Sequence, residues 1–164
     1  MICADCGCSV ERGLRISTCD DPSCCCHELL TSDVLDRMAA EIRRAFDAHD
    51  IAGWAALLAD DVRWGDDEAP NRCRNRAEVV ATFERVLAEG VDGEVTEIQT
   101  GSSGILCRLR VRRPDGTGEG AGASPGEALR EVLHLYRVRD GKVVEIRPFD
   151  ATAEAEARAE LWSY

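Results

Sequence analysis

Several features that define large classes of proteins are missing from this 164-residue sequence. No apolar run approaches the roughly 20 residues that a membrane-spanning helix needs, and no secretory signal is readable at the N-terminus. Lysine occurs once, as Lys142. The arginines alternate with acidic residues, whereas a phosphate-binding face needs clustered positive charge. We therefore expect a cytoplasmic protein, with a net charge of −11, that binds neither membrane nor nucleic acid.

Cysteine is abundant but very unevenly placed, with seven of the nine residues in the first 26 positions. In a reducing cytoplasm such a cluster favours a metal site over disulfides, although a disulfide knot is the alternative in an oxidising compartment. Residues 1–30 show no helical or strand period, and a bound ion could organise a segment too small to bury a core. The candidate ligands are Cys3, Cys6, Cys8, Cys19, Cys24, Cys25, Cys26 and His27.

The spacing of Cys3, Cys6 and Cys8 brings three thiolates within six residues, and Gly7 allows a tight turn between them. Cys3 and Cys6 could join two of the later ligands around zinc, or the whole set could hold a polythiolate copper or zinc cluster. The CxxCGC start also resembles the nickel-binding N-terminus of the GTPases that mature nickel-iron hydrogenases. That resemblance implies nickel handling, with a metalloenzyme or its maturation factor as partner. Zinc is our first expectation, nickel or copper the alternatives, and iron–sulfur a weaker one.

Residues 31–164 show the pattern of one α+β domain. Ser32 is predicted to cap a first helix, Asp50 a short second one, and Asn75 a third that ends at Gly90. Alternating apolar and polar residues predict an antiparallel sheet, with one short strand before the third helix and the other strands after it. The predicted strands are 62–64, 91–100, 105–111, 127–138 and 142–149, and a terminal helix follows over 151–161.

The last two strands meet at Asp140-Gly141, a two-residue turn signal. A regular hairpin places His134, Tyr136 and Arg147 on one face, which lines either a pocket or a dimer surface. An apolar face lies opposite. The pairs predicted on the mixed face are His134 with Arg147, Tyr136 with Glu145, and Val138 with Val143.

The stretch from Trp54 to Trp64, followed by Cys73-Arg-Asn-Arg-Ala-Glu-Val79, resembles the SnoaL-like branch of the nuclear transport factor 2-like superfamily. The resemblance spans about residues 34–150. It implies a cone-shaped fold, in which three helices pack on a curved antiparallel sheet around a pocket, and a homodimer formed through the sheet. This superfamily contains enzymes, binding proteins and scaffolds, so the fold alone does not give the function.

A resemblance to ketosteroid isomerases places Asp66 where their general base stands. Ile42 falls near the position of their oxyanion-hole tyrosine, and its side chain cannot donate a hydrogen bond. His134, Tyr136 and Arg147 are the other candidate catalytic residues. An apolar cone would raise the basicity of a carboxylate such as Asp66.

Three functions are consistent with these features. The first is a metal-binding accessory or interaction protein with a SnoaL-like pocket, linked to metalloenzyme maturation, and the concentration of cysteines in the tail favours it. The second is a SnoaL-like enzyme, of the isomerase, cyclase or epoxide hydrolase type, that uses Asp66 as general base on a small apolar carbonyl compound or epoxide. A metal store or sensor is a third possibility.

Overall fold

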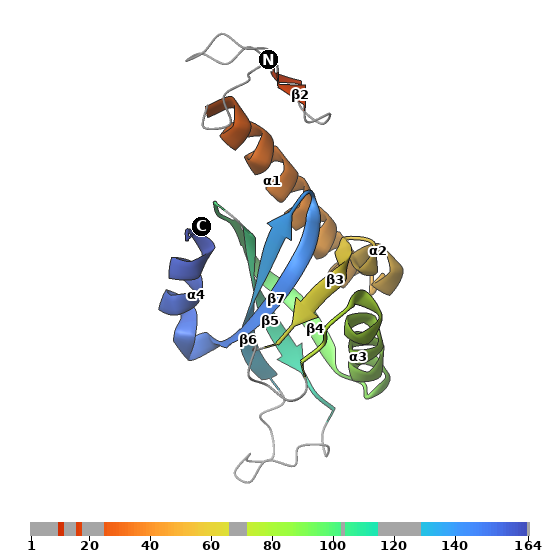
Figure 1. Cartoon of the computed structure of the whole chain (residues 1–164). Coiled ribbons are helices and arrows are strands. Elements are labelled where there is room, and N and C mark those ends of the chain that lie inside the picture. Colours follow the sequence, from red (N-terminus) through yellow and green to blue (C-terminus); the bar gives the residue numbers. More distant parts are fainter. Residues whose placement is uncertain are drawn as a thin grey trace.

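The computed structural model describes residues 10–11, 16–17, 25–65, 72–102, 104–114 and 129–163, with side chains from residue 33 onward. Within these ranges a five-stranded sheet carries helices on both faces (Figure 1). The helices are α1 (Cys25–Asp47), α2 (Ile51–Ala55), α3 (Arg76–Ala88) and α4 (Glu154–Leu161), the last preceded by the 3-10 turn η1 (Ala151–Ala153). The strands of this sheet are β3 (Leu58–Trp64), β4 (Asp92–Thr100), β5 (Gly104–Arg112), β6 (Leu129–Arg139) and β7 (Lys142–Asp150), while β1 (Val10–Glu11) and β2 (Ile16–Ser17) form a separate antiparallel pair.

Helix α1 is longer than the sequence pattern predicted. It begins at Cys25, so Ser32 lies inside it and is not its N-cap. No glycine or proline stands between Cys25 and Ser32 to stop the helix from extending toward the N-terminus. Neither α1 nor any other helix in the described ranges is long and apolar enough to cross a membrane.

The two other predicted N-caps are confirmed. The Asp50 carboxylate accepts a hydrogen bond from the Gly53 amide at 2.8 Å, and the Asn75 side chain accepts one from the Glu78 amide at 2.9 Å. Each bond satisfies an amide that has no partner within the helix. Gly90 follows α3 with φ at +79°, a conformation that favours glycine.

The strand order in the large sheet is β3-β7-β6-β5-β4. Three of the four pairings are antiparallel, as predicted, but β3 runs parallel to β7. The prediction of a purely antiparallel sheet is therefore wrong at this edge. The reason lies in the connectivity, because β3 comes before α3 and the other four strands and joins the sheet beside its last strand, β7.

A β-bulge changes the register of the β6–β7 hairpin. Val138 pairs with Val143 as predicted, but the next pair is Arg137 with Glu145, which leaves Val144 unpaired. The extra residue shifts every later pair by one position. The observed partners of Tyr136 and His134 are consequently Ile146 and Pro148, in place of Glu145 and Arg147.

The sheet separates two apolar cores. The inner core lies between the sheet and helices α1–α3, and includes the fully buried Ile42, Val79 and Tyr136. The outer core lies beneath α4 and consists of Leu106, Leu133, Leu135, Ala157 and Leu161, with Phe149 packed against them. The fold therefore has a layer of helices on each face of the sheet, which matches the expected α+β class with α4 as an outer layer (Figure 1).

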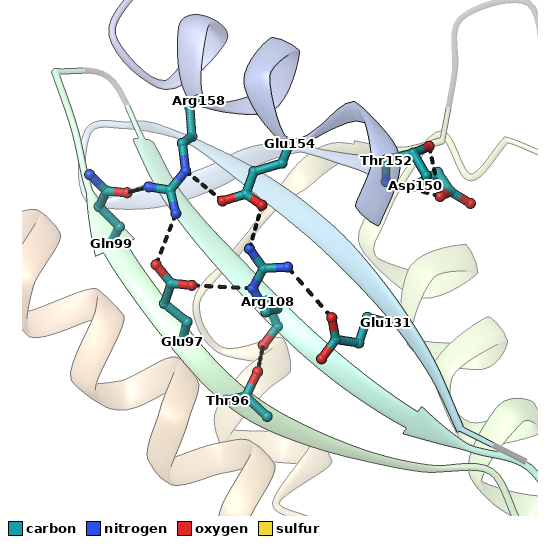
Figure 2. Close-up of polar contacts among 9 residues, drawn as sticks. All are labelled: Thr96, Glu97, Gln99, Arg108, Glu131, Asp150, Thr152, Glu154 and Arg158. Atoms are coloured by element: carbon teal, nitrogen blue, oxygen red, sulfur yellow. Dashed lines mark hydrogen bonds and ion pairs between the residues drawn. The ribbon is translucent and has the colours of Figure 1, made fainter.

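Charged side chains fix α4 to the outer face of the sheet (Figure 2). Arg108 of β5 contacts Glu154 of α4 at 2.8 Å, and also Glu97 at 3.2 Å and Glu131 at 3.6 Å. Arg158 of α4 reaches Glu154 at 2.8 Å and Glu97 at 3.0 Å. The Arg108 side chain is only 18% exposed. Its charge is therefore largely removed from water, and the three surrounding carboxylates balance it.

Candidate active site

Three rings form a row along the inner face of the sheet. The Trp64 ring lies edge-on to His134, with centroids 5.8 Å apart, and His134 lies edge-on to Tyr136 at 6.2 Å. His134 and Tyr136 share this face because they stand two positions apart on β6. Tyr136 is fully buried in the inner core. Of the two predicted roles for this face, the structure supports the lining of the interior.

His134 is a neutral imidazole at physiological pH. Desolvation by burial lowers its pKa from 6.5 to about 4. The residue is not completely covered, since part of its surface remains accessible. A neutral imidazole can donate a proton in a hydrogen bond through one nitrogen and accept through the other.

Two buried polar atoms next to this row have no hydrogen-bond partner in the described part of the chain: the Tyr136 hydroxyl and the Trp54 indole Nε1. The Trp54 indole lies close enough to the phenol to favour its ionised form, but the two groups do not form a well-shaped hydrogen bond with each other. Burial dominates and raises the pKa of Tyr136 well above its usual value. Both groups are therefore neutral donors in an apolar environment.

A hollow of about 290 Å³, its open mouth included, lies between the helices and the start of β4. Trp54 and Phe83 stack in its wall with ring centroids 4.6 Å apart, and Phe46 meets Phe83 edge-on at 5.7 Å. Part of that volume is open solvent at the mouth, so the enclosed space is far smaller than the roughly 300–1,000 Å³ typical of ligand sites. Its lining residues are Ala45, Phe46, His49, Asp50, Trp54, Phe83, Leu87 and Gly93.

Asp66, the predicted general base, lies outside the described residues. Strand β3 ends at Trp64, and the amide of the next residue, Gly65, donates a hydrogen bond to the Ile146 carbonyl at 3.1 Å. Trp64, beside His134, is thus two positions before Asp66 in the sequence. Ile42, near the tyrosine position of the isomerases, is fully buried in the inner core.

Arg147 does not belong to this constellation, and its predicted place beside His134 is wrong. Because of the bulge it pairs with Leu135, which faces the outer core. Its guanidinium binds Glu160 of α4 and lies over the Phe149 ring at 5.5 Å. Arg147 therefore holds α4 and cannot serve the interior.

Most of the predicted metal ligands lie outside the described residues, namely Cys3, Cys6, Cys8, Cys19 and Cys24. Cys25, Cys26 and His27 are in the first turn of α1, but their side chains are also outside the described part. Among the side chains that are described, no group of three potential ligands gathers. Cys73 and Cys107 are buried singly, and burial raises the pKa of Cys107 to about 12.

No local pattern in the sequence indicates that the Trp54 indole nitrogen lies near Tyr136 of β6, more than 80 positions later in the chain. The one available signal is composition, since a buried tryptophan and tyrosine both carry a donor that needs a partner.

The sequence matches the SnoaL-like domain family over residues 39–146, about two thirds of the chain. The chain belongs to the SnoaL-like family. The match begins within α1, includes Trp54, Trp64, His134 and Tyr136, and ends at Ile146 of β7. None of the curated proteins compared with the chain matches it.

Solved structures with the same fold include three that bear on this SnoaL-like domain. A proposed polyketide cyclase from Xanthomonas campestris has a TM-score of 0.58 and 16% identity, covering 74% of this chain and 93% of its own. A proposed ketosteroid isomerase from Kribbella flavida has a TM-score of 0.52 and 20% identity, covering 70% and 78%. RV0760c from Mycobacterium tuberculosis, solved with estradiol-17beta-hemisuccinate, has a TM-score of 0.53 and 21% identity, covering 71% and 92%. At these identities the likeness establishes the fold.

Proposed function

We propose that this SnoaL-like protein is an enzyme that moves a proton on a small apolar carbonyl compound or epoxide, with Asp66 as the general base. Family membership supports this, because the similar structures include a proposed polyketide cyclase and a proposed ketosteroid isomerase. The family match favours this function over the metal-binding accessory role, which the cysteines of the N-terminal segment favoured.

The neutral His134 beside Trp64 is the observation that carries the proposal. Burial lowers the pKa of His134 to about 4. His134 lies beside Trp64, the last residue of β3, so the surroundings of this end of the strand disfavour charged groups. The chain reaches Asp66 two residues after Trp64. A carboxylate in such surroundings is a stronger base than one in water.

The chemistry needs no external oxidant or reductant. The Asp66 carboxylate takes a proton from the carbon next to the carbonyl, and the electron pair of that C–H bond forms the enolate. The proton then returns to the same or another carbon. In a cyclase-type reaction the enolate carbon instead attacks a second carbonyl carbon of the substrate, the π electrons of that carbonyl move to its oxygen, and this oxygen takes the proton from Asp66. Neutral hydrogen-bond donors near the oxygen stabilise the charge as it develops.

Exchange of carbon-bound protons with solvent tests the proposal. With 1-indanone in D₂O, the wild-type protein should speed deuterium uptake at the carbon beside the carbonyl, as followed by proton NMR. Asp66→Asn should reduce the rate at least about 100-fold, as expected for loss of a general base. Asp67→Asn removes the adjacent carboxylate and is the matched control. An exchange rate that Asp66→Asn leaves unchanged would rule out this base.

A metal-binding tail remains a second proposal, supported by the seven cysteines in the first 26 residues. Zinc is the proposed ion, with nickel or copper as alternatives, and a metalloenzyme or its maturation factor is the partner such a tail would serve. It is independent of the chemistry in the cone. The homodimer implied by the family also stays a prediction.

A further inference from the structure

We infer that helix α4 is a removable cover, and that the sheet face beneath it is a docking surface for a second copy of this chain. With α4 in place the chain stays a monomer, and once α4 is displaced two copies pair through the uncovered face. Helices α1–α3 occupy the inner face, so a dimer through the sheet needs this outer face (Figure 1). The homodimer expected from the family resemblance is then the state in which α4 has moved away. The inference goes beyond the proposed enzyme and does not involve Asp66.

The sheet contributes more apolar surface to the outer core than α4 does. Four side chains on the adjacent strands β5, β6 and β7 form the floor of this core: Leu106, Leu133, Leu135 and Phe149. Helix α4 buries only Ala157 and Leu161 against them. Large exposed apolar patches mark interaction surfaces in folded proteins, so the floor has the character of such a surface once it is uncovered.

Helix α4 is a short element that depends on its partners in the sheet. It has eight residues, whereas isolated helices of fewer than about 12–15 residues are only marginally stable in water. The Glu160 carboxylate accepts hydrogen bonds from Arg147 and, at 3.3 Å, from Arg137. Glu154 contacts Arg108 of β5 at 2.8 Å (Figure 2). A short terminal helix held in this way opens at a lower free-energy cost than the strands beneath it.

The end of α4 lies directly against Gly101, in the turn after β4. A β-carbon at position 101 would lie 2.6 Å from the Leu161 carbonyl oxygen and would also clash with the Leu161 side chain. The Ser102 hydroxyl donates a hydrogen bond to the same carbonyl at 3.4 Å. Even a methyl group at position 101 therefore cannot be accommodated unless α4 or the turn moves.

The charges around the floor suit a second copy of the same face. Without α4, Arg108 keeps its contacts with Glu97 at 3.2 Å and Glu131 at 3.6 Å, while the two arginines that bind Glu160 lose this carboxylate. The uncovered face thus has an apolar centre with charges of both signs around it. A two-fold axis places the same patch of each copy against the other, so arginines of one copy can meet carboxylates of its partner.

Sedimentation equilibrium of the full chain at micromolar concentration tests the inference. The wild type should be a monomer. Glu160→Arg places a further positive charge beside Arg137 and Arg147, so it should release α4 and raise the association constant of the dimer at least about tenfold. Glu156→Arg makes the same change of charge at an exposed position of α4 and is the matched control, which should stay monomeric.

A second variant releases α4 without a change of charge. Gly101→Ala should also favour the dimer, whereas Gly93→Ala should not, because a β-carbon at Gly93 lies at an ordinary 3.8 Å from the Phe46 ring. Amide hydrogen exchange along α4 should be faster in Glu160→Arg and Gly101→Ala and unchanged in the two controls. Adding Leu133→Lys to Glu160→Arg should restore the monomer. Leu133 is uncovered once α4 has moved, so a lysine there is unfavourable only where a second copy buries it.

Four results would overturn the inference. The first is a wild-type dimer in which the amides of α4 remain protected from exchange. The second is an α4 that stays protected in both Glu160→Arg and Gly101→Ala, since the helix is then not a removable cover. The third is a monomer in which α4 has been released, because the uncovered face then binds no second copy. The fourth is a dimer that persists after Leu133→Lys, which would place the contact on another surface.

Discussion

His134 and Tyr136 show how one strand can hold two titratable groups neutral for the same reason. Desolvation lowers the pKa of the histidine to about 4 and raises that of the tyrosine, since in both cases burial disfavours the charged form. At neutral pH the inner face thus presents an imidazole and a phenol that can donate or accept hydrogen bonds without carrying charge. Such neutral donors can stabilise the oxygen of an enolate as its negative charge develops.

The lowered pKa of His134 makes folding depend on pH. Between about pH 6.5 and pH 4 the unfolded chain binds a proton that the folded chain excludes, so stability is highest above pH 6.5 and falls as pH drops toward 4. Over that interval the group contributes roughly 3 kcal/mol, at about 1.4 kcal/mol per pKa unit. His134→Gln should remove this contribution to the difference in unfolding free energy between pH 7 and pH 4.5, measured by urea denaturation.

His49→Gln is the control for that comparison, because the His49 side chain is 63% exposed. It should keep the wild-type pH dependence. Acidic groups titrate over the same range in every variant, so the difference between the two substitutions isolates His134. An equal pH dependence in wild type and His134→Gln would mean that His134 is not held neutral by the fold.

At the scale of elements, most helices and strands could be predicted from the sequence. The parallel direction of β3 and the register of the β6–β7 pair could not. Asp50 and Asn75 were predictable because an N-cap is a local signal, and so was the Asp140-Gly141 turn. The bulge at Val144 was not, since no glycine or proline stands beside it to mark it in the sequence. Because of this one extra residue, Arg147 pairs with Leu135 and not with His134, so the predicted site does not form.

Helix α4 gives a testable prediction at this scale. Hydrogen bonds from Arg108, and then from other arginines of the network, lower the pKa values of Glu97 and Glu154, so this stabilisation is present above about pH 4.5 and is lost below it. Glu154→Gln should loosen α4 and speed amide hydrogen exchange along it at pH 7. Glu156→Gln, on an exposed position of the same helix, is the control. Unchanged exchange in Glu154→Gln would show that apolar packing alone holds α4.

At the scale of the whole molecule, the chain joins a SnoaL-like domain to a cysteine-rich N-terminal stretch. The domain could be predicted from the spacing of its apolar residues and from Trp54 to Val79, and the family match confirms it. The two buried donors, the Trp54 indole and the Tyr136 hydroxyl, could not be predicted. These residues are far apart in the sequence and come together only in the folded domain. The ligands of the tail lie outside the described side chains and stay a prediction.

Elemental analysis of the full chain, purified anaerobically without an affinity tag, tests the tail. We expect on the order of one zinc ion per chain, or two for a polythiolate cluster. The double variant Cys6→Ser and Cys8→Ser should lose the ion and keep the far-UV spectrum of the domain. Cys73→Ala, outside the tail, should retain it. Free reactive thiols with no bound ion in the wild type would refute the metal site.

The measurement that tests the central claim most directly is the unfolding free energy of Tyr136→Phe without ligand. If the buried hydroxyl is kept for a ligand, its removal deletes an unpaired polar group, and stability should be unchanged or higher than in the wild type. Tyr164→Phe serves as reference. If Tyr136→Phe instead lowers the unfolding free energy by about 1 kcal/mol or more, the hydroxyl has a structural partner and the interior is core, not a binding site.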